Sequence, residues 1–100
     1  MPMFAVTLDH GDAWDDARGL REQDGWEPHA AFMDALVDEG FVILGGPLGD
    51  GSRVLLAIDA DDADAVRARL APDPWHVDDH LRIATIEPWT VLLRAPGWED

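Results

Sequence analysis

The spacing of apolar residues along the chain predicts strands and helices in alternation. Met3 to Leu8 alternates between two faces, as a half-buried strand does. Apolar residues three apart from Trp14 to Leu20 suit a short surface helix. A longer helix is predicted from Glu27 to Glu39, with apolar residues at i, i+3, i+4 and i+7, Pro28 in the first turn and Gly40 as the C-terminal cap.

Two apolar runs then flank a glycine-rich segment. Phe41 to Leu44 and Arg53 to Ile58 are predicted to be the strands of a hairpin. Asp61 and Asp62 favour the positive end of a second helix, which ends before Pro72.

The last third of the chain predicts an acidic loop followed by two more strands. Asp73 to Trp75 is read as the loop, and Leu81 to Glu87 and Trp89 to Leu93 as strands separated by Pro88. The main elements therefore run strand, helix, strand, strand, helix, strand.

This order predicts one α+β domain over residues 1–100, with the split βαβ arrangement. A four-stranded antiparallel sheet is then covered by helices on one face only. Because apolar residues occupy both faces of Met3 to Leu8, the open face would expose a large apolar area. We therefore expect two chains to close their sheets together as a homodimer.

Charge and composition exclude several classes of function. Seven basic residues against 21 acidic ones give a net charge of -14, which disfavours binding to nucleic acid or to an anionic membrane. The chain has no cysteine, tyrosine or lysine, so thiolate, phenol and Schiff-base chemistry are excluded. Apolar runs such as Phe41 to Leu44 are far shorter than the roughly 20 residues of a membrane span. The first residues lack a basic or long apolar leader, so a cytoplasmic location is expected.

Histidine spacing gives only a weak indication of a metal site. His76 and His80 have the i, i+4 spacing of zinc ligands on a helix, but Pro74 and the strand that follows argue against a helix there. No metal and no cofactor are therefore predicted. His10 is expected to lie in a solvated loop.

Several short motifs, in order, cover nearly the whole chain. They are Trp26 and His29 at a helix start, Leu36 and Gly40 at its end, Gly45-Gly46-Pro47-Leu48, Asp50-Gly51, Asp73-Pro74-Trp75 and Pro88-Trp89. In these motifs the chain resembles the YCII-related (YciI-like) family. The resemblance implies a ferredoxin-like fold and a dimeric α+β barrel. The chain departs from the usual family pattern at the start of the last strand, where it has His80-Leu81 and the family often has a Gly-Leu pair.

The resemblance also implies that His29 and Asp73 form a pair in a small pocket. A carboxylate that fixes the imidazole tautomer leaves the other ring nitrogen free as a general base, so His29 is the candidate catalytic base and Asp73 its orienting partner. From the residues alone, the favoured interpretation is that His29 is a packed histidine at a helix start and that Asp73 is a turn residue before proline.

The glycine-rich segment is the candidate binding loop. Gly45, Gly46 and Pro47 let backbone amides approach a ligand, or form only a tight hairpin. A neutral or anionic ligand would also need a donor such as Arg53 or Arg82 to offset the negative field of the chain.

Tryptophans complete the candidate pocket. Trp26, Trp75 and Trp89 would line it with flat apolar area, or serve as ordinary core or dimer contacts, which is the favoured interpretation for Trp89. We expect a homodimeric enzyme with lyase or isomerase chemistry on a small organic molecule, and some enzymes related to the family are dehydrochlorinases of chlorinated aromatic compounds. The alternative is a non-catalytic dimer that binds a small ligand or regulates through it.

Overall fold

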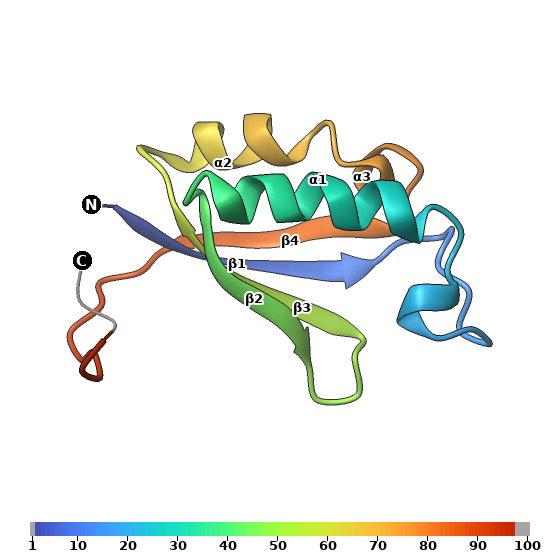
Figure 1. Cartoon of the computed structure of the whole chain (residues 1–100), viewed down its shortest axis with the longest axis horizontal. Helices are drawn as coiled ribbons and strands as arrows, with labels where there is room; N and C mark the ends of the chain where they lie inside the picture. Colours follow the sequence, from blue (N-terminus) through green and yellow to red (C-terminus); the bar gives the residue numbers. More distant parts are fainter. Residues whose placement is uncertain (1, 98–100) are drawn as a thin grey trace.

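A four-stranded antiparallel sheet carries the helices on one face (Figure 1). The structure is a computed structural model, and it describes residues 2–97. The strands, in the order β2-β3-β1-β4 across the sheet, are β1 (Met3–His10), β2 (Val42–Leu48), β3 (Arg53–Asp59) and β4 (Leu81–Pro88). Neighbouring strands are antiparallel throughout. The predicted α+β class and four-stranded antiparallel sheet are confirmed, and the order is consistent with a ferredoxin-like fold.

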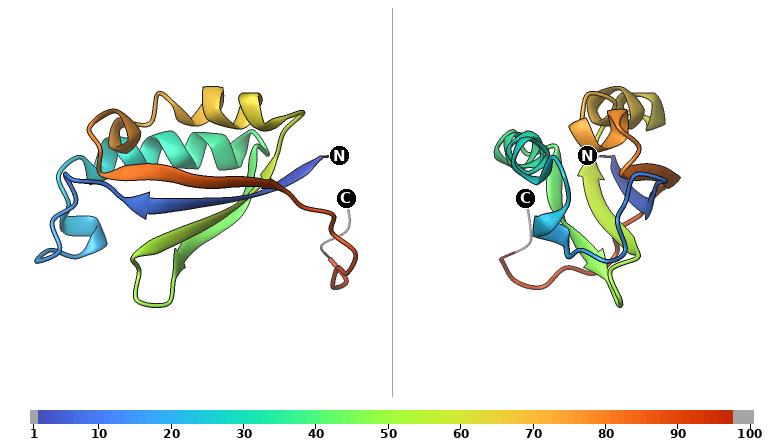
Figure 2. Two further views of the ribbon diagram at one scale, coloured as in Figure 1. Left: turned by 180° about the vertical axis from the view of Figure 1, so that it is seen from behind. Right: turned by 90° about the vertical axis from the view of Figure 1, so that its right-hand side faces the viewer.

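Three α-helices and one 3-10 turn connect the strands. They are η1 (Leu20–Glu22), α1 (Trp26–Asp38), α2 (Ala63–Leu70) and α3 (Pro74–Val77). Seen along the sheet in Figure 2 (right), α1 and α2 lie on the same side of it, while the β2–β3 hairpin extends away from both. This arrangement leaves one face of the sheet without helices.

The core lies between the sheet and the helices. On β1, Phe4, Val6 and Leu8 are buried and face the helices, as the alternation predicts. Leu36 of α1 and Val66 of α2 pack against them. Burial of these alternate side chains fixes the face that each strand turns toward the helices.

Both longer helices have the ends that the sequence predicts. The carboxylate of Asp62 caps α2 by accepting a hydrogen bond from Ala65 N at 2.8 Å. Helix α1 ends at Asp38, and Gly40 follows with a φ of 80°, a left-handed conformation that favours glycine. The expected bounds of this helix, Glu27 to Glu39, were wrong by one residue at each end.

Three local predictions were wrong. Trp89 to Leu93 is not a strand, because β4 ends at Pro88 and Trp89 N already bonds to Met3 O, where β1 begins. Trp14 to Leu20 forms no helix, and η1 is the only helical turn described there. Gly45 to Pro47 lies inside β2, so the hairpin turns later, at residues 49–52.

The loop predicted at Asp73 to Trp75 is instead the start of α3. The Asp73 carboxylate accepts a hydrogen bond from Trp75 N at 3.0 Å, and Pro74 occupies the first turn, where a missing N–H costs nothing. Aspartate before proline is therefore a helix start here.

A salt-bridged turn joins α3 to β4. Asp79 has a φ of 68°, and its carboxylate binds the Arg82 guanidinium through two hydrogen bonds of 2.7 and 2.8 Å and accepts a third from Asp12 N. The hydrogen bond from Arg82 lowers the pKa of Asp79 to about 2. This turn also meets the loop after β1, since Gly11 N donates to His80 O.

We expect Arg82→Gln to raise the pKa of Asp79 toward its usual range, because the strongest group favouring the carboxylate is removed. In the native protein the folded pKa lies below the unfolded one, so the contribution to stability is present above the unfolded value and is lost as the pH falls through about 2. Titration of the side-chain carboxyl by NMR in both proteins measures the change. An unaltered midpoint would show that Arg82 does not hold the carboxylate.

Candidate functional site

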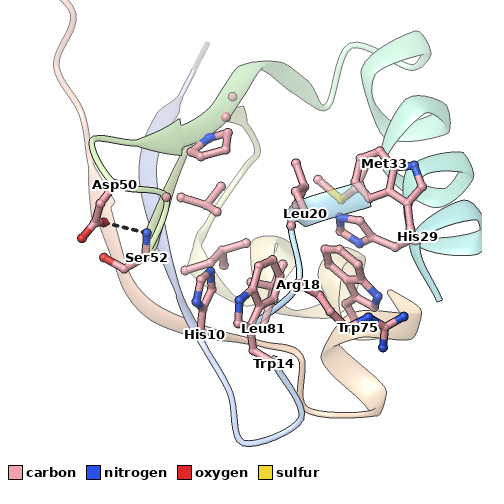
Figure 3. A pocket seen from close by; sticks show the side chains of 18 of the residues that line it. His10, Trp14, Arg18, Leu20, His29, Met33, Asp50, Ser52, Trp75 and Leu81 are labelled. Atoms are coloured by element: carbon pink, nitrogen blue, oxygen red, sulfur yellow. Dashed lines mark hydrogen bonds between the residues drawn. The ribbon is translucent and has the colours of Figure 1, made fainter. Parts of the chain in front are cut away.

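A pocket of about 580 Å3 opens between the helix α1 and the β2–β3 hairpin (Figure 3). Its walls come from β1, the loop through η1, the first half of α1, the hairpin and α3. The residues that line it include His10, Trp14, Asp16, Arg18, Trp26, His29, Gly45, Gly46, Pro47, Asp50 and Trp75. The glycine-rich segment and the two tryptophans, Trp26 and Trp75, therefore line one cavity as the sequence predicts.

His29 and Asp73 form a buried hydrogen-bonded pair. Nδ1 of His29 lies 2.8 and 3.0 Å from the two carboxylate oxygens of Asp73. Both residues are buried, with 9% and 4% of their surface exposed. Because an ionised carboxylate only accepts, Nδ1 donates, and Nε2 is left as the basic nitrogen of the neutral ring. His29 lines the pocket and Asp73 does not, so the carboxylate supports the ring from behind.

A second pair stands on the other side of Trp75. The Trp75 ring is stacked on the His29 ring at 4.0 Å and on the His80 ring at 5.3 Å. Nδ1 of His80 lies 2.8 Å from a carboxylate oxygen of Asp78. Asp73 and Asp78 are the two cap residues of α3, so this single helical turn holds one histidine against each face of its own tryptophan.

Trp75 is itself fixed in place. It has no exposed surface, and its Nε1 donates to Asp24 O at 2.8 Å, in the loop that precedes α1. The position of the His29 ring is therefore set by a carboxylate at its edge and by an immobile indole on its face.

The sequence analysis did not identify His10 and Trp14 as pocket residues. Their rings are stacked at 3.8 Å, and His10 lies at the end of β1, so the prediction of a solvated loop was wrong. The Trp14 ring meets Trp75 edge to face at 5.5 Å. The stacked rings of His10 and Trp14 are four positions apart, but the contact of Trp14 with Trp75 joins segments about 60 positions apart, which no local pattern indicates.

Gln23 organises the loop that carries this wall. The side chain is buried, donates to the carbonyls of Asp15 and Arg18 at 2.7 and 2.9 Å, and accepts from Asp15 N at 2.9 Å. All three bonds fold residues 15–23 back on themselves. A buried glutamine with every polar atom paired is a structural clamp rather than a ligand.

Gly45, Gly46 and Pro47 form part of the cavity wall as strand residues. In the ladder they pair with Leu56, Leu55 and Val54 of β3. The structure thus places this segment at the pocket as expected but not as a loop, and its role in binding a ligand stays a prediction.

The two glycines differ in what a side chain would meet. A Cβ atom on Gly45 would lie 2.5 Å from Leu56 Cδ2 and 3.1 Å from Leu55 O, whereas one on Gly46 has open space. We expect Gly45→Ala to lower the free energy of unfolding by about 1–3 kcal/mol through overpacking. Gly46→Ala is the matched control and should leave it unchanged or slightly raised. Urea unfolding of both variants checks this, and equal effects would contradict the tight packing at Gly45.

The two arginines expected to donate hydrogen bonds to a ligand lie outside the pocket. Neither Arg53 nor Arg82 lines the cavity, and Arg82 is bound to Asp79. Arg18 does line it, but its guanidinium is ion-paired with Asp24 at 3.2 Å. The prediction that Arg53 or Arg82 serves as the donor in this pocket was therefore wrong.

The contacts of His80 are with residues other than His76. Nδ1 of His80 is bonded to Asp78 and its ring is stacked on Trp75, although α3 supplies the helical turn that the sequence argued against. Within residues 2–97, no group of three or more histidine or acidic side chains is placed to hold a metal ion.

Comparison of the chain with protein-family models and with curated proteins finds no match in either set. None of the helices in residues 2–97 has the length and apolar character needed to cross a membrane.

Proposed function

We propose that the chain is an acid–base enzyme of the YCII-related kind, with lyase or isomerase chemistry on a small organic molecule. The observation that carries the proposal is the buried contact between His29 Nδ1 and Asp73 at the wall of the pocket. The cavity of about 580 Å3 falls in the size range typical of small-molecule sites.

The proposed chemistry is a proton transfer at His29. Nε2 takes a proton from the substrate, and the imidazolium that forms is stabilised by the Asp73 carboxylate at the opposite nitrogen. The same nitrogen then returns the proton, either to a neighbouring atom of the substrate or to a leaving group. His29 is buried and the indole of Trp75 is stacked on its ring, which limits the access of water to the imidazole.

Screening for turnover tests this function. Thermal-shift screening first identifies small molecules that stabilise the protein, and each is then incubated with native protein and with His29→Gln. We expect a stabilising compound to be consumed by the native protein, and the variant to be slower by about 10²–10⁴-fold, as for loss of a general base. A compound that binds and is returned unchanged would favour the alternative, a non-catalytic ligand-binding module.

We propose further that two chains form a homodimer through the open sheet face, giving a dimeric α+β barrel with ferredoxin-like halves. Apolar side chains on this face support it. Ile43, Leu44 and Leu48 of β2 are 41%, 46% and 37% exposed, and Leu44 pairs with Ala57, whose side chain points away from the helices. The three exposed side chains form an apolar patch of the kind that marks protein–protein interfaces.

The oligomeric state can be changed at one position. We expect sedimentation velocity to show a dimer of twice the 11.0 kDa chain mass, and Leu44→Glu to shift it to monomer, because an interface on the order of 1,500 Å2 would have to bury the new charge. Val77→Glu, exposed on α3 among the helices, is the control and should remain dimeric. A native monomer at micromolar concentration would exclude the dimer.

A further inference from the structure

The fixed charges and the aromatic walls of the pocket favour one class of ligand. We propose that the pocket binds an organic cation, such as a substituted ammonium group carried on an apolar body. The inference rests on the proposed function only in using the same pocket as the ligand site, and it does not depend on His29 acting as a base.

Indole rings form much of the wall. Trp14 and Trp26 line the cavity, and their planes are inclined to that of Trp75 by 83° and 51°, with ring centres 5.5 and 5.7 Å from it. The negative face of an indole attracts a cation within about 6 Å. Trp26 already does so, since the Arg21 guanidinium lies 5.6 Å from its ring centre, although Arg21 itself does not line the pocket.

Within residues 2–97, neither of the two carboxylates at the pocket is ion-paired with an arginine. Asp16 and Asp50 both line the pocket. Ser52 N donates to the Asp50 carboxylate at 2.9 Å, which lowers the pKa of Asp50, so this group is charged at neutral pH.

Positive charge at the same walls is already balanced. Of the arginines in residues 2–97, only Arg18 lines the pocket, and it is ion-paired with Asp24. The histidines have acidic partners as well: His29 binds Asp73, and His10 interacts electrostatically with Asp50. An anionic ligand would therefore find no uncommitted cation, whereas a cation would find two carboxylates.

The charge of the whole chain acts in the same direction. A net charge of -14 on 100 residues produces a negative potential that raises the local concentration of cations at the mouth of a cleft. This contribution decreases with salt, while the contact with the indole faces does not.

Three probes of nearly equal shape separate charge from apolar packing. Choline carries a quaternary nitrogen, 3,3-dimethylbutan-1-ol has carbon in its place, and 3,3-dimethylbutanoate is an anion of similar size. Each is titrated into the full chain at low and at physiological salt, and the indole N–H signals of Trp14 and Trp26 are followed by NMR, with Trp89 outside the pocket as the reference. We expect choline to bind about tenfold more tightly than the neutral alcohol, and the anion to bind weakest.

Two variants test the groups invoked. Trp26→Leu should lower the affinity for choline severalfold without lowering that for the alcohol. Asp50→Asn, which keeps an acceptor for Ser52 N, should weaken choline at low salt more than at high salt. Trp89→Leu is the control and should alter neither.

Several binding results would contradict the proposed cation site. Equal binding of choline and the alcohol, tightest binding of the anion, or no response to choline at any soluble concentration would each overturn the proposal. His29→Gln should still prefer choline, because the preference comes from the indoles and carboxylates. If the native protein prefers choline but consumes none of the compounds that bind it, the proposed enzyme is refuted while the cation site stands.

Discussion

Trp75→Ala should destabilise the protein by about 3–5 kcal/mol in the free energy of unfolding, more than any of the other substitutions proposed for this chain. The indole is fully buried, is stacked between His29 and His80, and donates a hydrogen bond to Asp24 O. Its removal leaves a cavity in contact with both histidines and frees the carbonyl of Asp24. Urea unfolding followed by circular dichroism measures the loss.

Two further variants separate the causes. Trp75→Phe keeps an aromatic ring beside the two histidines but lacks the indole N–H, so it should lose the hydrogen bond, worth about 1 kcal/mol. It should also lose part of the packing, because the phenyl ring is smaller than the indole. Val77→Ala, in the same helix but 74% exposed, should change stability by about 0.5 kcal/mol or less. If Trp75→Ala were no more destabilising than Val77→Ala, the stacked rings of His29, Trp75 and His80 would not contribute to the stability of the core.

Sheet and helices could be predicted because each depends on a local pattern. The alternation from Met3 to Leu8 continues to His10 as β1, and the Asp62 cap begins α2 where the acidic pair indicates. Trp89 to Leu93 has the composition of a strand but no partner, because pairing with β1 ends where that strand begins. Whether an apolar run becomes a strand is decided by the neighbouring strand, which composition does not reveal.

The candidate site was accessible from the sequence only in part. His29 and Asp73 are 44 positions apart, and only the family resemblance connected them before the structure placed Nδ1 2.8 Å from the carboxylate. The stacking of His29 and His80 on Trp75 depends on α3, a helix of four residues that is too short for a periodic pattern. The sequence therefore indicated only the i, i+4 spacing of His76 and His80, and not the pair that His80 forms with Asp78.

Removing the Asp73 carboxylate should change which nitrogen of His29 carries the proton. In the native protein Asp73 accepts from Nδ1, so the neutral ring should be the Nδ1–H tautomer, with Nε2 unprotonated toward the pocket. In Asp73→Ala the Nε2–H tautomer, which predominates for histidine in water, should take over. The ¹⁵N shifts of the ring nitrogens above neutral pH report the tautomer directly. Loss of the α3 cap and of the partner of a buried ring should also cost about 2–4 kcal/mol in stability.

Asp78→Ala provides the matched comparison, because it removes the other cap of α3 and the other histidine's carboxylate. We expect it to shift the tautomer of His80 and leave that of His29, while Asp73→Ala does the reverse. Circular dichroism establishes that both variants are folded before the spectra are compared. A His29 ring that keeps its tautomer without Asp73, in a folded chain, would mean that the carboxylate does not orient it. The proposed general base would then lack the group that leaves Nε2 free to accept a proton, and a ligand-binding role would account better for the pocket.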